Sequence, residues 1–182
     1  HRRMELAADC WASRRAAAPE RRVGEYLFQA LGPWSDGWRP TGLQRAAEIL
    51  GTSAPIFGGL PDRELSSRRE DLKAALARQI EAFHPDLVLS PSPVEIHPDH
   101  RALGETLYEL VAASRPEDAG HDLYRLLSIA YYELSHPMLP NTLVDIAPVA
   151  AKKREAIAAF ESQQSVRDYG AAMGGLNAYR RL

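Results

Sequence analysis

Hydrophobic positions recur along the chain with helical spacing in some segments and as short apolar runs in others. Leu72, Leu76 and Ile80 recur at intervals of four and predict one face of a helix that ends near Phe83. The run Asp86–Ser90 that follows is typical of a strand buried on both faces of a parallel sheet. Segments of these two kinds alternate, which predicts an α/β layered domain with a largely parallel sheet.

The same patterns predict further elements on both sides of this segment. Ser66 or Ser67 would begin the helix just described, because a serine hydroxyl can satisfy a free amide at a helix N-terminus. Gly51 is well placed to end an earlier helix, since glycine adopts left-handed backbone angles freely. The remaining expected elements are two short helices within the first forty residues, helices over 41–50, 99–111 and 148–163, and strands over 55–57, 126–134 and 141–146.

Composition narrows the class of protein. A chain of 182 residues with 45% hydrophobic residues can bury the core of one compact domain, so a single domain over residues 1–182 is expected. The net charge of −2 gives no general reason to expect nucleic acid or an anionic membrane as partner. Arginine doublets near the N-terminus are interleaved with acids, which favours a solvated helical face; a helical nucleic-acid-binding domain is the competing interpretation.

Cysteine content and hydropathy bear on location. The single cysteine, Cys10, has no partner for an internal disulfide and cannot form a cysteine zinc cluster, so a reducing cytoplasm is expected. No apolar run approaches the length of a membrane span, and the polar N-terminus lacks the apolar region of a secretory signal. We therefore expect a cytoplasmic protein without a membrane span.

The tripeptide His-Pro-Asp occurs twice, on either side of the expected strand. In the first copy, residues 84–86, Pro85 would end the preceding helix and His84 would lie near the negative end of its dipole. The second copy, residues 97–99, follows the strand. Ligands of open α/β sheets bind beyond the carboxyl ends of the strands, so the second copy is the one expected to be functional.

His97, Asp99 and His100 place two imidazoles and a carboxylate close together in sequence. Neutral imidazole binds zinc and carboxylates orient histidines, so these groups can share a metal and acid–base cluster. A capping Asp99 with exposed histidines is the alternative interpretation.

The sequence around these residues, "SPSPVEIHPDHRALGETLYELV", closely resembles the second signature of the PIG-L/LmbE family of zinc-dependent N-deacetylases. The resemblance extends upstream through "LQRAAEILGTSAPIFGGLPDREL" and downstream through "LVDIAPVAAKKREAIAAFESQ", in matching order. It implies a Rossmann-like fold. It also implies a metal-dependent hydrolase that removes the acetyl group from an N-acetylglucosamine-type amino sugar or conjugate.

Position by position, the resemblance implies a role for each residue of the motif. His100 would be a Zn²⁺ ligand, and His97 the catalytic histidine that polarises the acetyl carbonyl or protonates the departing amine. Asp99 would hold His97 in its charged, oriented form, in agreement with the general effect of a neighbouring carboxylate on an imidazole. Substrate contacts are implied for Arg39 and Asp62, with a turn-forming Asp62 as an equal alternative.

The sequence also departs from the family's pattern. The other family signature, a His-Pro-Asp-Asp-Glu string that normally supplies two metal ligands and the general base, is absent. Because this signature and its ligands are absent, we expect that the sequence starts inside the protein and that the chain as given is inactive or nearly so, and the missing initiator Met agrees with this. A divergent member that has lost catalysis is the alternative.

Three smaller features of the resemblance concern single positions. Gly42 stands where family members usually carry a glutamate, which weakens the expectation of substrate recognition by that helix. Arg101 is interpreted as a surface or structural arginine. Ser162 and Gln163 match a late Ser-Gln of the family, and equally match a helix end that exposes polar groups.

These observations predict a zinc-dependent N-deacetylase with one of its metal ligands retained in this sequence. Its partner would be a small N-acetylated amino sugar or conjugate, without nucleic acid. The competing function is a non-catalytic α/β module of the same fold that retains the sugar pocket.

Overall fold

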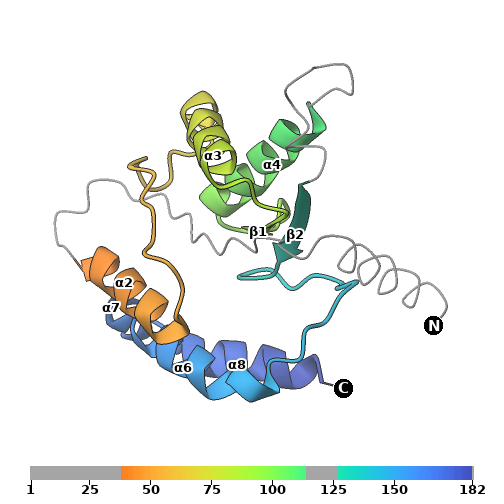
Figure 1. Cartoon of the computed structure of the whole chain (residues 1–182). Helices are drawn as coiled ribbons and strands as arrows, with labels where there is room; N and C mark the ends of the chain where they lie inside the picture. Colours follow the sequence, from red (N-terminus) through yellow and green to blue (C-terminus); the bar gives the residue numbers. More distant parts are fainter. Residues whose placement is uncertain (1–37, 114–126, 182) are drawn as a thin grey trace.

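The computed structural model describes residues 38–113 and 127–181, with side chains from residue 42 onward. The two short helices predicted within the first forty residues and the arginine doublets there lie outside these ranges. The described elements, in chain order (Figure 1), are α2 (Trp38–Leu50), α3 (Arg69–Phe83), β1 (Leu87–Pro91), α4 (Pro98–Ala112), β2 (Ser128–Tyr132), η1 (Ala147–Val149), α6 (Ala150–Ala158), α7 (Glu161–Gln164) and α8 (Tyr169–Tyr179).

A parallel pair of strands forms the described sheet. β1 and β2 pair in register from Leu87 opposite Ser128 to Pro91 opposite Tyr132. Parallel neighbours need a crossover connection, and α4 lies between the two strands in the chain and packs on β1. The predicted α/β class with a parallel sheet is therefore confirmed.

The apolar stripe predicted for the helix before β1 forms one side of the core. Leu72, Leu76 and Ile80 of α3 are buried and pack against Leu103 and Leu107 of α4, which lies beside α3 in Figure 1. Leu72 is fully buried. Docking α3 and α4 together on β1 holds the N-terminus of α4 at the carboxyl edge of the sheet.

The other described helices form a second packed group. α2 contacts α6 and α7, and α8 contacts α6 and α7, as Figure 1 shows at the lower edge of the molecule. A Cβ added to Gly42 would lie 3.1 Å from the Ala159 carbonyl oxygen, so the missing side chain lets α2 approach the α6–α7 junction. At the end of α2, Gly51 adopts a φ of 76°, which confirms its prediction as the left-handed terminator.

Two predicted strands are wrong. Residues 55–57 contain a single bridge residue, Phe57, and no strand. Residues 141–146 form none either, because they pair with no described strand and leave Leu143 and Val144 63% and 77% exposed. A short apolar run predicts a strand only where another strand is placed to receive its backbone hydrogen bonds.

Two predicted helices differ in detail. The helix expected over 148–163 is divided into η1, α6 and α7, because Phe160 leaves the helical conformation at φ −90° and ψ 60°. α3 is not capped by Ser66 or Ser67, since the Ser67 hydroxyl donates to the Glu64 carbonyl oxygen and Arg68 takes the capping position. α8, which was not predicted, is capped by the Asp168 side chain, which accepts from the amide of Ala171.

The prediction that the first strand is buried on both faces is also wrong for the described residues. Val88 packs against the α3–α4 core, whereas Leu89 is 52% exposed. Successive strand residues point to opposite faces, so only one face of β1 is covered by these helices.

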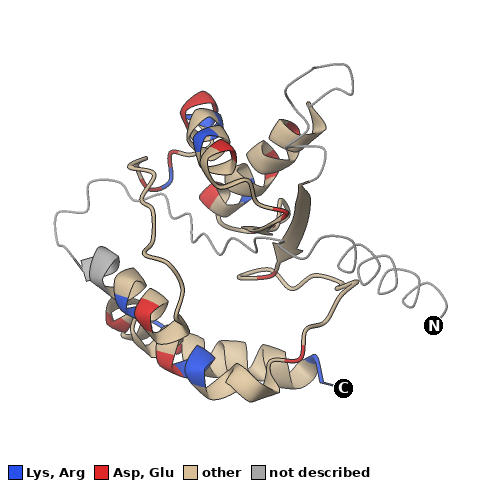
Figure 2. Cartoon of the chain, viewed as in Figure 1, with Lys and Arg blue, Asp and Glu red and all other residues tan. Residues whose placement is uncertain are grey.

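Charges of both signs occur together on the longer helices of the core. Figure 2 shows acidic and basic residues interspersed along α3 rather than gathered by sign. Among the described residues, no helix is both long enough and apolar enough to cross a membrane.

Candidate active site

The second His-Pro-Asp begins helix α4 just beyond the end of β1. His97 is the N-cap residue with extended backbone angles, and its Nδ1 accepts a hydrogen bond from the Asp99 amide at 3.3 Å. Pro98 follows in the first turn, where its missing N–H costs nothing. The motif therefore lies at the carboxyl edge of the sheet, as predicted.

Asp99 is buried and ties α4 to a distant turn. Only 5% of the residue is exposed, and its carboxylate accepts from the amides of Arg63 at 2.5 Å and Leu65 at 3.2 Å. The alternative in which Asp99 caps the helix is thus wrong, because His97 supplies the cap. Arg63 adopts a positive φ of 64°, a strained conformation for a residue with a side chain, so the turn is held in shape by its surroundings.

The turn held by Asp99 brings Asp62 to the same place. One ligand atom each from Asp62, His97 and Asp99 lie within 4.8 Å of one another. Asp62 thus lies in a turn, which agrees with its interpretation as a turn-forming residue, and it also contributes to the cluster. Its contact with substrate stays a prediction. Carboxylate oxygen and imidazole nitrogen are donors that bind divalent metal ions, so the donor set fits such an ion.

His100 lies beside this cluster with one nitrogen buried. Its ring centroid is 4.7 Å from that of His97, and the two rings are tilted by 34°. Nδ1 of His100 is buried, has no hydrogen-bond partner among the described residues, and lies 4.0 Å from Oε2 of Glu95. Burial, and then the neighbouring His97, lower the pKa of His100, which favours the neutral ring that can bind a metal.

Glu95 was missed by the sequence analysis. It is 1% exposed, and its carboxylate accepts from the backbone amides of Leu134, Ser135 and His136, the closest at 2.8 Å. Its sequence context gave no signal of burial, because a charged residue in a proline-rich loop is ordinarily exposed. Burial, and then Glu95, raise the pKa of Tyr132 to about 12.

The loop between β1 and α4 is held against the helix at a glycine. A Cβ added to Gly104 would lie 2.6 Å from the Pro91 carbonyl oxygen and 3.0 Å from the Pro93 nitrogen. No side chain fits there, so the backbone of α4 approaches the loop directly. The Tyr131 hydroxyl donates to the Gly104 carbonyl oxygen at 3.3 Å and connects β2 to the same point.

The other predicted residues are placed as follows. Arg39 lies in the first turn of α2, and its side chain is outside the described part. The Arg101 guanidinium donates to the Glu95 carbonyl oxygen at 3.3 Å, consistent with its structural interpretation. Ser162 and Gln163 lie on α7, which packs on α2 and α8.

The first His-Pro-Asp has the structural role that was predicted for it. His84 ends α3 with a left-handed φ of 52°, and its amide donates to the Ile80 carbonyl oxygen. Among the described side chains, His84 is not part of a group that could hold a metal ion.

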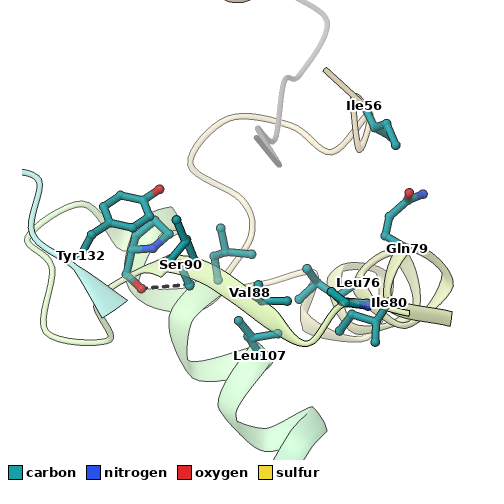
Figure 3. A pocket seen from close by; sticks show the side chains of 12 residues that line it. Ile56, Leu76, Gln79, Ile80, Val88, Ser90, Leu107 and Tyr132 are labelled. Carbon is teal, nitrogen blue, oxygen red and sulfur yellow. Dashed lines mark hydrogen bonds between the residues drawn. The ribbon is translucent and has the colours of Figure 1, made fainter. Parts of the chain in front are cut away.

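An apolar pocket lies apart from the cluster, against β1, α3 and α4 (Figure 3). None of Asp62, His97, Asp99 and His100 lines it. Its lining residues are Ile56, Leu76, Gln79, Ile80, Pro85, Val88, Leu89, Ser90, Pro91, Leu103, Leu107 and Tyr132.

The fold and the site together define an α/β protein with an acidic and imidazole cluster at the carboxyl edge of a parallel sheet. The fold is similar to the crystal structure of the conserved protein TT1542 from Thermus thermophilus. The TM-score is 0.65 at 22% sequence identity, and the match covers 86% of this chain and 74% of that chain.

Sequence comparison specifies the family. Residues 26–111 match the PIG-L family model, described as GlcNAc-PI de-N-acetylase. The chain is 31% identical over 125 residues to the probable N-acetyl-alpha-D-glucosaminyl L-malate deacetylase 2 of Bacillus anthracis. That alignment covers 66% of this chain and 54% of the relative, so the chain spans about half the length of the curated relative it matches. The predicted resemblance is confirmed.

Proposed function

We propose that this chain is part of a zinc-dependent N-deacetylase that hydrolyses the acetamido group of an N-acetylglucosamine-type sugar or conjugate. The observation that carries the proposal is the position of His97, Asp99 and His100, inside the segment that matches the PIG-L family and beside Asp62. The name of the Bacillus anthracis relative supports a glucosaminyl substrate. We further propose a single domain and a cytoplasmic location.

His100 is the residue proposed to hold the metal ion. Asp99 is less suited to that task, because both of its oxygens already accept backbone hydrogen bonds from the turn at residues 63–65. Zinc bound at such a site would lower the pKa of a water molecule and polarise the acetyl carbonyl. A hydrolytic zinc site ordinarily uses three protein ligands, and the family signature that supplies the other two is absent from the 182 residues.

His97 is the proposed proton donor. Its Nδ1 accepts a hydrogen bond from the Asp99 amide, which leaves Nε2 to carry the ring proton. From this position Nε2 would donate to the carbonyl oxygen of the acetyl group, or to the nitrogen of the departing amine. Asp99 contributes by presenting its amide to His97 and by fixing the turn that carries Asp62, rather than by a direct carboxylate bond to the ring.

The test is release of primary amine from an N-acetylglucosamine glycoside in the presence of zinc. We expect the 182-residue chain to be inactive or nearly so, and the chain extended by its upstream coding sequence to be active. In the extended protein His97→Asn should reduce the rate by about 10²-fold or more. The matched control is His84→Asn in the other His-Pro-Asp, because asparagine tolerates the left-handed angles of that position.

The opposite outcome has a definite meaning. An extended protein that binds the glycoside but releases no amine would favour the non-catalytic sugar-binding module. An equal loss of rate in His97→Asn and His84→Asn would show that the second His-Pro-Asp has no specific chemical role.

A further inference from the structure

A buried carboxylate lies between His100 and the segment that follows β2. Glu95 is 1% exposed, yet among the described residues no Lys or Arg side chain pairs with its carboxylate. Arg101, the nearest cation in sequence, donates to the Glu95 main-chain oxygen instead. The charge is compensated by the amides of residues 134–136, which converge on Oε1, and by Ser135, which also reaches Oε2.

This arrangement leaves Oε2 directed toward His100. The distance from Oε2 to Nδ1 is 4.0 Å, and Nδ1 is a buried polar atom that finds no other partner in the described parts of the chain. A carboxylate accepts hydrogen bonds and cannot donate them, so it favours a proton on the nitrogen that faces it. The amides of residues 134–136 keep the carboxylate from turning away.

We propose that Glu95 is the positioning residue of His100, which selects the Nδ1–H tautomer and leaves Nε2 as the nitrogen with a free lone pair. Carboxylates hold metal-binding histidines in this way in many metal sites, where they fix both the tautomer and the ring orientation. The relevance of the free Nε2 to a metal ion rests on the proposed function. The effect of Glu95 on the ring does not, because it depends only on residues of this chain.

The substitution Glu95→Gln makes the two ends of the side-chain head group chemically different, one an acceptor oxygen and the other a donor NH₂. The amide oxygen of glutamine should face residues 134–136, since these present only N–H donors. The NH₂ group would then face His100 and favour a lone pair on Nδ1, so that the proton moves to Nε2. Glu95→Asp keeps the charge but withdraws it by one methylene, and should give a mixture of the two tautomers.

The test is ¹⁵N NMR of the histidine-labelled 182-residue protein without metal, at about pH 8, where imidazole is ordinarily neutral. The His100 signals are assigned by their loss in His100→Gln. We expect the Nδ1–H tautomer in the wild-type protein and the Nε2–H tautomer in Glu95→Gln. Glu155→Gln, the same change at an exposed glutamate of α6, should leave the spectrum of His100 unchanged.

Hydrogen exchange of the Leu134–His136 amides is the second measurement, and it should accelerate by about tenfold or more in Glu95→Gln. If that variant does not unfold cooperatively, Glu95→Asp replaces it in both measurements. A wild-type His100 protonated on Nε2, or a tautomer that is the same in the wild-type protein and both variants, would overturn the proposal. Neither measurement uses metal or substrate, so a failure of the proposed deacetylase function would be seen separately.

Discussion

The Asp99 carboxylate accepts a hydrogen bond from the backbone amide of Arg63 at 2.5 Å, across 36 positions of sequence. Its other oxygen accepts from Leu65, so one buried side chain holds two amides of the turn that presents Asp62. The same residue presents its own amide to the ring of His97. Asp99 therefore organises both sides of the cluster.

Asp99→Asn should destabilise the protein by about 1–3 kcal/mol. Asparagine has one acceptor oxygen, so its NH₂ group would face either the Arg63 or the Leu65 amide. Urea denaturation measures the difference. Asp71→Asn is the control, because Asp71 is exposed and its contact with Arg68 is long at 3.7 Å. An Asp99→Asn protein as stable as this control would show that the two amide bonds contribute little.

Gly104→Ala should also be destabilising, by about 1–3 kcal/mol. The added Cβ would lie 2.6 Å from the Pro91 carbonyl oxygen and 3.0 Å from the Pro93 nitrogen. Both atoms belong to the backbone, which cannot move aside at low cost. Gly174→Ala in α8 is the matched control, since no atom of the described residues lies within 4 Å of the new Cβ. It should stabilise the protein by about 0.5–1 kcal/mol, because alanine favours the helix. Thermal denaturation of both variants should give shifts of opposite sign.

Stability should depend on pH through the pair of Glu133 and Arg180. Hydrogen bonds from Arg180, at 2.7 Å for the closest, lower the pKa of Glu133 from 4.5. A carboxyl group with a lowered pKa stabilises the folded state above its unfolded pKa, and this contribution disappears as the pH falls through the folded value. The stability difference between the wild-type protein and Glu133→Gln should therefore shrink below about pH 4.5. A difference that is constant between about pH 3 and 7 would contradict this assignment.

Leu72→Ala should cost about 2–5 kcal/mol. Leu72 is 0% exposed in the core between α3 and α4, so its truncation removes apolar contact and leaves a cavity. Leu139→Ala removes the same atoms from a residue that is 99% exposed and should change the free energy of unfolding very little. Urea denaturation of the two variants compares them directly. Similar losses in both would mean that Leu72 is not part of a packed core.

Periodic segments with long buried faces were predictable from the sequence. Leu72, Leu76 and Ile80 are spaced so that one face of α3 is apolar, and the structure buries that face. The absence of strands at residues 55–57 and 141–146 was not predictable, because an apolar run gives no sign of whether a partner strand exists. The break of the predicted 148–163 helix at Phe160 lies where α2 approaches at Gly42, a contact distant in sequence that no local pattern marks.

The site was predictable only where its residues are neighbours in sequence. The second His-Pro-Asp and its place after β1 were recognised, and Asp62 was named through the resemblance. The partners of Asp99 were not foreseen, because they are main-chain amides 34 and 36 positions away, which no side-chain pattern marks. Glu95 was missed for the same reason, since its burial is created by the amides of residues 134–136.

The hydrogen bonds of Arg180 have a consequence for protein engineering. Its guanidinium donates to Glu133 and to the Met138 carbonyl oxygen, so the end of α8 holds the segment whose amides also bind Glu95. Trimming the chain before Arg180, or fusing a bulky tag directly after it, would weaken these contacts. The disturbance would reach the imidazoles at the start of α4 although the cut lies at the opposite end of the sequence.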